Sequence, residues 1–338
     1  MAKKKSRSGL LKAPKTITGK LGTPKSLKPQ RTREIIRRFH VLQKSKTLVI
    51  IKLRKSYPQI TVNDYNVIQA DASYKSAFKT DSSYKSAFKS FIAPTKYSDN
   101  PIYKIDDTLT KSDLVQILAR IDSEIEQRGG IEAYQSASTQ GQTSKRGGDS
   151  SKKLVEWLQS DKYENKLNDV TALEIGCLSP HNVISTCGIF KDIVRIDLNS
   201  QDPLILEQNF MDRPLPENES EKFNLISCSL VINFVPTPKE RGEMLIRMTK
   251  FLKKPKKNMS SLFLVLPLPC VSNSRYFDNE RLLEMMTMLG FQQTFYYEAK
   301  KVAYWLFDWT GKTKLVKSFQ KKELHSGSSK NNFCITIS

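Results

Sequence analysis

The chain has 338 residues, 55 of them Lys or Arg against 34 Asp or Glu, and a formal net charge of +21 at pH 7. This length suits one large domain with extensions or two smaller domains, and at about 150 residues per domain it favours two; the 38% hydrophobic content is sufficient for a core. No stretch of about 18 apolar residues predicts a membrane-spanning helix, and the five cysteines and three histidines show no zinc-ligand spacing, so we expect no metal and a reducing compartment.

The positive charge is concentrated in the N-terminal part of the chain. Residues 1–55 hold 18 basic residues and one acid, Glu34, which leaves a net charge of only +4 for the other 283 residues. This asymmetry favours nucleic acid as partner, ahead of an anionic membrane, with a solubilising tail as the alternative. Residues 1–30 have few large apolar side chains, so we expect a disordered basic tail. Its KKKSR cluster fits a nuclear or nucleolar address, and no apolar run follows it to form a secretory signal.

A mainly helical region is expected over residues 31–130. Apolar side chains at helical spacing predict a basic amphipathic helix from about Thr32 to Lys44, whose basic face either contacts RNA or is exposed to solvent while the helix packs on the body. A second helix is predicted from Lys111 or Ser112 to Arg128, with Gly129 ending it. Between them YKSAFK occurs twice, at 74–79 and 84–89, and we assign this repeat no function.

Strands and helices alternate in the second part of the chain, expected to be one domain over residues 131–312. A Gly-, Ser- and Thr-rich stretch at 139–151 is either a linker or a loop that wraps a ligand, and a helix is predicted at Lys153–Gln159. Four apolar runs predict strands buried on both faces of a parallel sheet: VTALEIG, DIVRIDL, FNLISCSLVINFV and SSLFLVLPL.

The remaining pattern completes an α/β fold. Helices are predicted at Pro238–Leu252 and Asn279–Leu289, and residues 291–309 predict an antiparallel hairpin that turns near residues 299–301. We therefore expect a doubly wound, mostly parallel, seven-stranded sheet closed by an antiparallel C-terminal hairpin. Residues 313–338 are expected to form a basic C-terminal tail.

The candidate cofactor site lies where two predicted strands end. LEIGCLSP places Glu174 and Gly176 after the first strand, and VRIDL ends the next strand with Asp197, whose carboxylate can accept hydrogen bonds from two ribose hydroxyls. No GxGxxG loop is present to hold a pyrophosphate, which favours S-adenosylmethionine over a dinucleotide. Met211 and Asp212, in the QNFMD segment, are expected to hold adenine. The alternative is a plain α/β domain in which Gly176 only makes a turn.

Several segments resemble the yeast-type large-subunit (25S) rRNA adenine-N1 methyltransferases, whose animal relatives include a sensor of S-adenosylmethionine in growth signalling. The segments are RGGDSSKKLVEWL, LEIGCLSPHN, RIDLNS, QNFMDRPLP and SLVINFVPTPKERGEML, with SLVINFVP the most distinctive. The resemblance implies a class I (Rossmann-like) methyltransferase fold, S-adenosylmethionine bound through Gly176 and Asp197, and a nucleolar substrate in large-subunit rRNA or pre-ribosomal particles.

The end of the fourth strand faces the transferred methyl group in this fold, so Asn233 and Phe234 are the candidate catalytic residues. Asn233 either contacts the base or only forms a turn. We expect an rRNA (adenine-N1)-methyltransferase of ribosome biogenesis, located in the nucleus and nucleolus, with a monomer favoured. The alternatives are a non-catalytic S-adenosylmethionine sensor and an RNA-binding ribosome-assembly factor.

Overall fold

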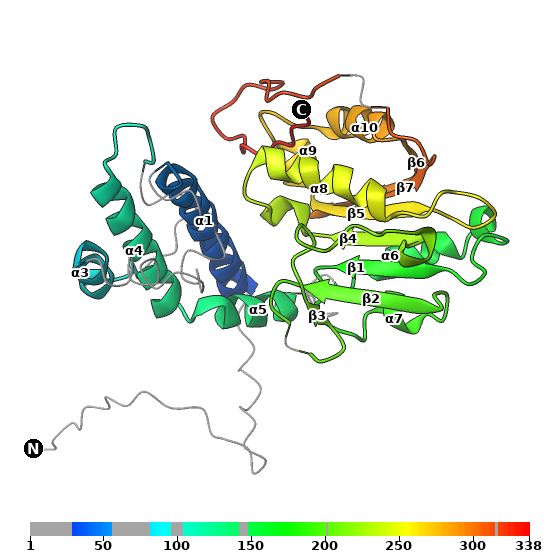
Figure 1. Ribbon diagram of the computed structural model, residues 1–338, viewed down its shortest axis with the longest axis horizontal. Helices are drawn as coiled ribbons and strands as arrows, with labels where there is room; N and C mark the ends of the chain where they lie inside the picture. Colours follow the sequence, from blue (N-terminus) through cyan, green and yellow to red (C-terminus); the bar gives the residue numbers. More distant parts are fainter. Residues whose placement is uncertain (1–28, 56–81, 96–103, 142–147, 201, 315–316) are drawn as a thin grey trace, which may run out of the picture.

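A computed structural model describes residues 29–55, 82–95, 104–141, 148–200, 202–314 and 317–338. Two parts lie side by side: a helical region and a sheet covered by helices (Figure 1). The helical region consists of α1 (Pro29–Leu53), α3 (Ser82–Ser90), α4 (Lys111–Gln127) and α5 (Gly130–Gly141). Most of the expected N-terminal tail and the first YKSAFK copy lie outside the described residues, whereas the second copy lies within α3.

Helix α1 is longer than predicted because its apolar spacing continues beyond Lys44. Val49, Ile50 and Leu53 are buried against α3 and α4 in a cluster of apolar side chains. Helix α4 is confirmed, and it begins with a reciprocal capping box between Thr110 and Asp113 that satisfies free N–H groups of its first turn.

A buried ion pair joins α1 to α4. The Arg38 guanidinium donates Nε to Glu124 Oε1 at 2.8 Å and Nη2 to Oε2 at 2.9 Å, while Arg128 Nε also donates to Oε1 at 2.6 Å. Burial raises the pKa of Glu124, but the hydrogen bonds from the two guanidinium groups outweigh it, so the pKa lies below its ordinary value. This geometry fixes how α1 lies on α4.

The second part is a seven-stranded sheet in the order β3-β2-β1-β4-β5-β7-β6 among the described residues. Strands β1 to β5 are parallel, and β7 runs antiparallel to both β5 and β6. This arrangement confirms the predicted doubly wound sheet with a C-terminal hairpin. The strands are β1 (Thr171–Ile175), β2 (Asp192–Asp197), β3 (Leu206–Glu207), β4 (Leu225–Ser229), β5 (Ser261–Pro267), β6 (Phe291–Glu298) and β7 (Val302–Trp309).

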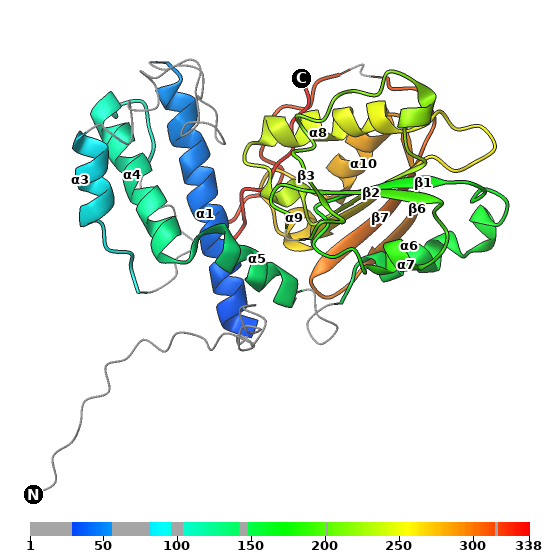
Figure 2. The ribbon, with the colours of Figure 1, turned by 60° about the horizontal axis from the view of Figure 1, so that its bottom comes forward.

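Helices cover both faces of the sheet (Figure 2). Along β5, Leu262, Leu264 and Leu266 face one core, shared with α8 (Pro238–Phe251), α9 (Pro269–Ser272) and α10 (Asn279–Met288). Phe263 and Val265 face the other core, shared with α6 (Ser151–Leu158) and α7 (Val183–Thr186). Burial on both faces explains why the strands read as apolar runs without alternation. Short 3₁₀ turns complete the fold at η1 (Asp161–Tyr163), η2 (Glu219–Glu221) and η3 (Ile232–Phe234).

Two segments differ from the sequence prediction. The apolar run at 223–235 is a strand only as far as Ser229, because Leu230 has a left-handed backbone with φ +58° and the chain then turns into η3. The C-terminal segment, expected to be a basic tail, packs on the body: Phe319, Phe333 and Ile337 are buried in the core beside α8 and α10. The prediction of a tail was wrong because it rested on the basic charge of this segment and did not weigh its apolar residues.

Candidate active site

The turn after β1 is built around Gly176. Its φ of +75° is one that L side chains rarely adopt, and its N–H donates to Ile196 O at 2.9 Å, which ties the end of β1 to β2. A Cβ at this position would lie 2.4 Å from Cγ2 of Val231, in the turn after β4. Gly176 therefore lets the carboxyl ends of β1, β2 and β4 come together at one edge of the sheet, where ligands bind in this architecture.

Glu174 is buried at the same edge. Its Oε1 accepts a hydrogen bond from Asn182 Nδ2 at 2.8 Å, whereas its Oε2 is buried with no donor among the described residues. Burial raises the pKa of Glu174 above its ordinary value, against the lowering effect of the hydrogen bond from Asn182. A buried carboxylate oxygen without a donor leaves room for a hydrogen bond from a ligand.

The segment before α6 also reaches this edge. The Asp149 carboxylate accepts hydrogen bonds from Ser151 N at 2.9 Å and from Val183 N at 2.5 Å, and Ser150 Oγ lies 2.7 Å from Ser229 Oγ at the end of β4. The described C-terminal end of the glycine-rich 139–151 stretch is thus bonded to the start of α7 and to the end of β4, while residues 142–147 lie outside the described part. Asp149 was missed by sequence reasoning, although the RGGDSS motif contains it.

Asp197 ends β2, as predicted. Its Oδ1 accepts a hydrogen bond from Asn199 N at 3.0 Å, and its backbone carbonyl accepts one from Gln208 N at 2.8 Å, which brings the segment after β3 to the same edge. Burial raises the pKa of the Asp197 carboxyl, with a further contribution from the Glu207 charge. The side chain remains half-exposed. One carboxylate oxygen is thus hydrogen-bonded locally, and the other remains for a ligand.

The two candidate adenine-binding residues differ in exposure. Met211 is half-buried and packs against the main core, whereas Asp212 is exposed and accepts a hydrogen bond from Asn209 Nδ2 at 2.8 Å within its own loop. Arg247 of α8 anchors this loop, since its Nε donates to Phe210 O at 3.0 Å. Met211 is thus held against the core, whereas Asp212 is bonded within its own loop; both stay predictions as adenine-binding residues.

Asn233 and Phe234 lie in η3, directly after the left-handed Leu230. A leucine in this conformation costs about 1–2 kcal/mol, and backbone strain of this kind gathers at functional sites. Asn233 Oδ1 is buried, and no donor among the described residues reaches it. The site thus has a second unpaired acceptor, on the turn after β4.

Arg241 of α8 fixes the chain that follows η3. Its buried guanidinium donates to Val235 O at 2.9 Å, Pro236 O at 3.2 Å and Cys334 O at 2.7 Å, and it lies 4.7 Å from the centre of the Phe333 ring. The C-terminal segment is therefore a support of the η3 turn. Sequence reasoning missed this role because the contact with Cys334 O joins α8 to a distant part of the chain.

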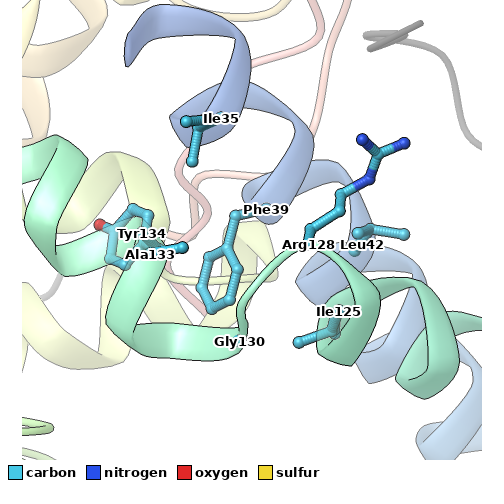
Figure 3. Close-up of a pocket in the computed structure, with 8 residues that line it drawn as sticks. All are labelled: Ile35, Phe39, Leu42, Ile125, Arg128, Gly130, Ala133 and Tyr134. Carbon is cyan, nitrogen blue, oxygen red and sulfur yellow. The ribbon is translucent and has the colours of Figure 1, made fainter. Parts of the chain in front are cut away.

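A pocket outside this edge lies within the helical region, between α1, α4 and α5 (Figure 3). Apolar side chains dominate its lining, and the one charged residue there, Arg128, is bonded to Glu124. The lining holds no predicted site residue. Its residues are Ile35, Phe39, Leu42, Ile125, Arg128, Gly130, Ala133 and Tyr134.

Metal and membrane chemistry find no support in the described part of the chain. No cluster of three or more His, Cys, Asp or Glu side chains suited to a metal ion occurs there. None of the helices there combines the length and hydropathy needed to cross a bilayer. All five cysteines are free thiols, and burial raises the pKa of Cys177, Cys228, Cys270 and Cys334.

Comparison with known proteins gives consistent matches. Residues 119–335 match the family model described as 25S rRNA (adenine(2142)-N(1))-methyltransferase, Bmt2. A Saccharomyces cerevisiae protein named 25S rRNA (adenine(2142)-N(1))-methyltransferase is 36% identical over 343 residues, covering 96% of this chain and 98% of that protein. A Schizosaccharomyces pombe protein named 25S rRNA adenine-N(1) methyltransferase is 41% identical over 226 residues, covering 65% of this chain and 82% of that protein.

Solved structures show weaker likeness. The N-methyltransferase NodS from Bradyrhizobium japonicum, solved with S-adenosyl-L-homocysteine, is 13% identical with a TM-score of 0.31, and the match covers 47% of this chain and 98% of that one. The sheet order of the chain itself, rather than this likeness, carries the assignment of the fold class.

Proposed function

The chain belongs to the family of 25S rRNA (adenine-N1)-methyltransferases, and from that premise we propose that it transfers a methyl group from S-adenosylmethionine to N1 of an adenine in large-subunit rRNA. The single observation that carries this proposal is the family match over residues 119–335, which spans every strand of the sheet and the whole carboxyl edge. The enzyme class and the cofactor follow from the same match.

The carboxyl edge fits S-adenosylmethionine. Gly176 brings backbone without a side chain to the place where a cofactor lies, and Asp197 offers a carboxylate oxygen to ribose hydroxyls. Glu174 Oε2 is a buried acceptor without a donor, which suits a ligand that carries hydroxyl, amino and ammonium donors. The chain after Gly176 has no glycine until Gly188, so it lacks the glycine-rich loop that would hold the pyrophosphate of a dinucleotide.

S-adenosylmethionine, when bound, supplies an electrophilic methyl group on a positively charged sulfur. Adenine N1 has an in-plane lone pair that attacks this carbon, so the chain needs neither a covalent nucleophile nor a base. Its task is to hold the base in line with the methyl group, and orientation of this kind is worth up to about 7–11 kcal/mol. N1 lies on the Watson–Crick edge, so the target adenine must be unpaired or flipped out.

Asn233 and Phe234 fit the target base. The free Oδ1 acceptor of Asn233 matches the N6 amino group, a donor beside N1 that guanine lacks at this position. Methylation leaves the adenine cationic, because the positive charge of the sulfonium passes to the base. An amide oxygen and an aromatic face both stabilise such a charge. Asn233 is therefore proposed as the residue that orients adenine, and Phe234 as an aromatic wall beside it.

The basic N-terminal segment is proposed to supply RNA affinity. Residues 1–28 hold nine Lys or Arg residues and no acid, so contacts with rRNA phosphates would be sequence-independent and weakened by salt. On the same basis we propose a partner in pre-ribosomal particles and a nuclear and nucleolar location. A monomeric enzyme stays a prediction. Base choice lies instead in the near-neutral domain that carries the acceptors.

Cells that lack the protein test the proposal. Nucleosides from their large-subunit rRNA are quantified by mass spectrometry, and primer extension locates the modified base, since a methyl at N1 blocks pairing with the incoming nucleotide. We expect one N1-methyladenosine, and its primer-extension stop, to disappear and to return with the wild-type gene. An unchanged N1-methyladenosine content would refute the proposal, and saturable cofactor binding without transfer would support a sensor instead.

Asn233 is tested by a matched pair of variants. Asn233→Asp keeps an oxygen acceptor and Asn233→Leu removes it at similar volume. We expect the leucine variant to lose more methyl-transfer rate than the aspartate variant, with cofactor affinity unchanged in both. Equal loss of stability and equal rates in the two variants would show that Asn233 only forms the turn.

A further inference from the structure

Helix α1 of the helical region contacts the active-site turn. The His40 imidazole stacks on the Phe234 ring, with 3.8 Å between ring centroids and 12° between planes. Tyr134 of α5 meets both rings edge-on, at 5.0 Å from His40 and 6.5 Å from Phe234. We name these three residues the aromatic contact. Figure 2 shows α1 between α4 and the sheet, so the helical region is placed against η3 rather than apart from it.

The aromatic contact holds a polar atom without a partner. His40 Nε2 is buried, and nothing among the described residues hydrogen-bonds to it. Asn233 precedes Phe234 in the chain, and its Oδ1 is likewise buried without a hydrogen-bond partner among the described residues. Two further such atoms occur in the described part, and one of them is Glu174 Oε2 at the cofactor edge. A buried polar atom left unpaired costs about 1–3 kcal/mol. The unpaired atoms of His40 and Asn233 flank the η3 turn after β4, and this pairing points to a ligand that hydrogen-bonds to them.

The imidazole of His40 is neutral. Burial, followed by the charge of Lys44, lowers the pKa of His40 to about 3. A neutral ring is compatible with the methylated base, since an imidazolium at this place would repel the positive charge that adenine gains. The two stacked rings are at van der Waals separation, so a base must meet the aromatic contact from outside the stack.

Lys44 adds positive charge one helical turn from His40. Its side chain is exposed, and in the described residues no carboxylate pairs with it. Neighbouring chain removes part of the water around the Lys44 ammonium, and this desolvation, followed by the charge of the Arg241 guanidinium, lowers the pKa of Lys44. Arg241 is itself bonded to backbone carbonyls rather than to an acid. Positive charge without a balancing acid favours a phosphate, which every nucleotide carries.

We propose that the flipped-out target nucleotide binds along α1 at the aromatic contact, with His40 Nε2 hydrogen-bonded to the base and Lys44 beside its phosphate. This inference rests on the proposed function and extends it: the helical region completes the substrate site, in addition to any role as an RNA tether. Position 40 and position 44 share one face of α1 because they are four residues apart.

The test compares single substitutions in the full-length protein. His40→Phe keeps a ring that stacks on Phe234 and removes the nitrogen, and Lys44→Gln removes the charge at similar length. Lys89→Gln is the matched control, because Lys89 is an exposed lysine on α3, on the far side of the helical region (Figure 1). Each protein is assayed for methyl transfer to unmethylated large-subunit rRNA, for S-adenosylmethionine affinity by calorimetry and for melting temperature.

We expect kcat/KM of His40→Phe to fall about tenfold, the equivalent of one lost hydrogen bond. Its cofactor affinity should equal that of the wild type, and its melting temperature should be equal or higher, because the unpaired nitrogen is gone. Lys44→Gln should raise KM for RNA severalfold at unchanged kcat, and Lys89→Gln should change neither. Wild-type kcat/KM in His40→Phe and wild-type KM in Lys44→Gln would overturn the inference while the proposed function stands. A fall explained by lost cofactor affinity would also overturn it. Absence of transfer by the wild type would instead refute the proposed function.

Discussion

Replacement of Gly176 by alanine perturbs the point where three strand ends meet. The added Cβ has two separate effects: it forces an L side chain into a backbone with φ +75°, and it places a methyl 2.4 Å from Val231 Cγ2. Gly188 offers a matched control, because its φ is +73° and a Cβ there meets nothing within 4 Å. Alanine at either position therefore carries the cost of a left-handed backbone, and only alanine at position 176 also clashes with Val231.

The magnitudes follow from these geometries. A left-handed conformation costs an L residue about 1–2 kcal/mol, which both alanine variants lose in free energy of unfolding. Overpacking adds about 1–3 kcal/mol at Gly176 alone. We therefore expect Gly188→Ala to lose about 1–2 kcal/mol and Gly176→Ala about 2–5 kcal/mol. Because the displaced turn also approaches the cofactor, only Gly176→Ala should weaken S-adenosylmethionine binding.

Urea unfolding and calorimetric titration of both variants measure these quantities. The combined variant Gly176→Ala/Val231→Ala removes the clashing methyl, so the double-mutant cycle should return a favourable coupling energy of about 1–3 kcal/mol. Equal destabilisation of the two single variants, no coupling with Val231 and unchanged cofactor affinity would refute the assignment of Gly176 to a sterically closed cofactor turn.

Three further predictions concern other parts of the molecule. Asp197→Ala should weaken S-adenosylmethionine about 10- to 150-fold, the equivalent of about 1.5–3 kcal/mol for hydrogen bonds to a charged group, and unchanged calorimetric affinity would contradict the site. Glu124→Gln should cost about 3–5 kcal/mol, since it leaves Arg38 and Arg128 without their carboxylate. Because the folded pKa of Glu124 is lowered, its stabilisation is present above the unfolded pKa and is lost as pH falls through the folded one, so urea unfolding of the variant should show less acid sensitivity; equal sensitivity would contradict the pairing. Deletion of residues 1–28 should reduce the slope of log affinity for rRNA against log salt by about 0.7–0.9 per lost phosphate contact, and an unchanged slope would contradict the role of the tail.

Strand ends could be predicted from the sequence, whereas contacts between distant segments could not. Gly176 and Asp197 follow from apolar runs that end in a glycine and a carboxylate, because parallel strands of a doubly wound sheet end at one edge. Leu230 carries no local signal for a left-handed backbone, so the run at 223–235 reads as one long strand.

Side-chain contacts across the fold were equally hidden. His40 reads as one residue of an amphipathic helix, and only the fold brings its ring onto Phe234. Arg241 reads as a surface base in PKERGEM, yet it is buried and donates to carbonyls of the chain after η3 and of the C-terminal segment. The contacts of His40 with Phe234 and of Arg241 with Cys334 join residues far apart in the sequence, where periodicity and propensity give no information.

Methyl transfer by the purified protein tests the central claim most directly. The protein is incubated with unmethylated large-subunit rRNA and S-adenosylmethionine that carries an isotopically labelled methyl group, and the digested nucleosides are identified by mass spectrometry. We expect label in N1-methyladenosine, and much less label with Asp197→Ala at a cofactor concentration that does not saturate the variant. Label in a different nucleoside, or no transfer by a protein that binds the cofactor, would contradict it.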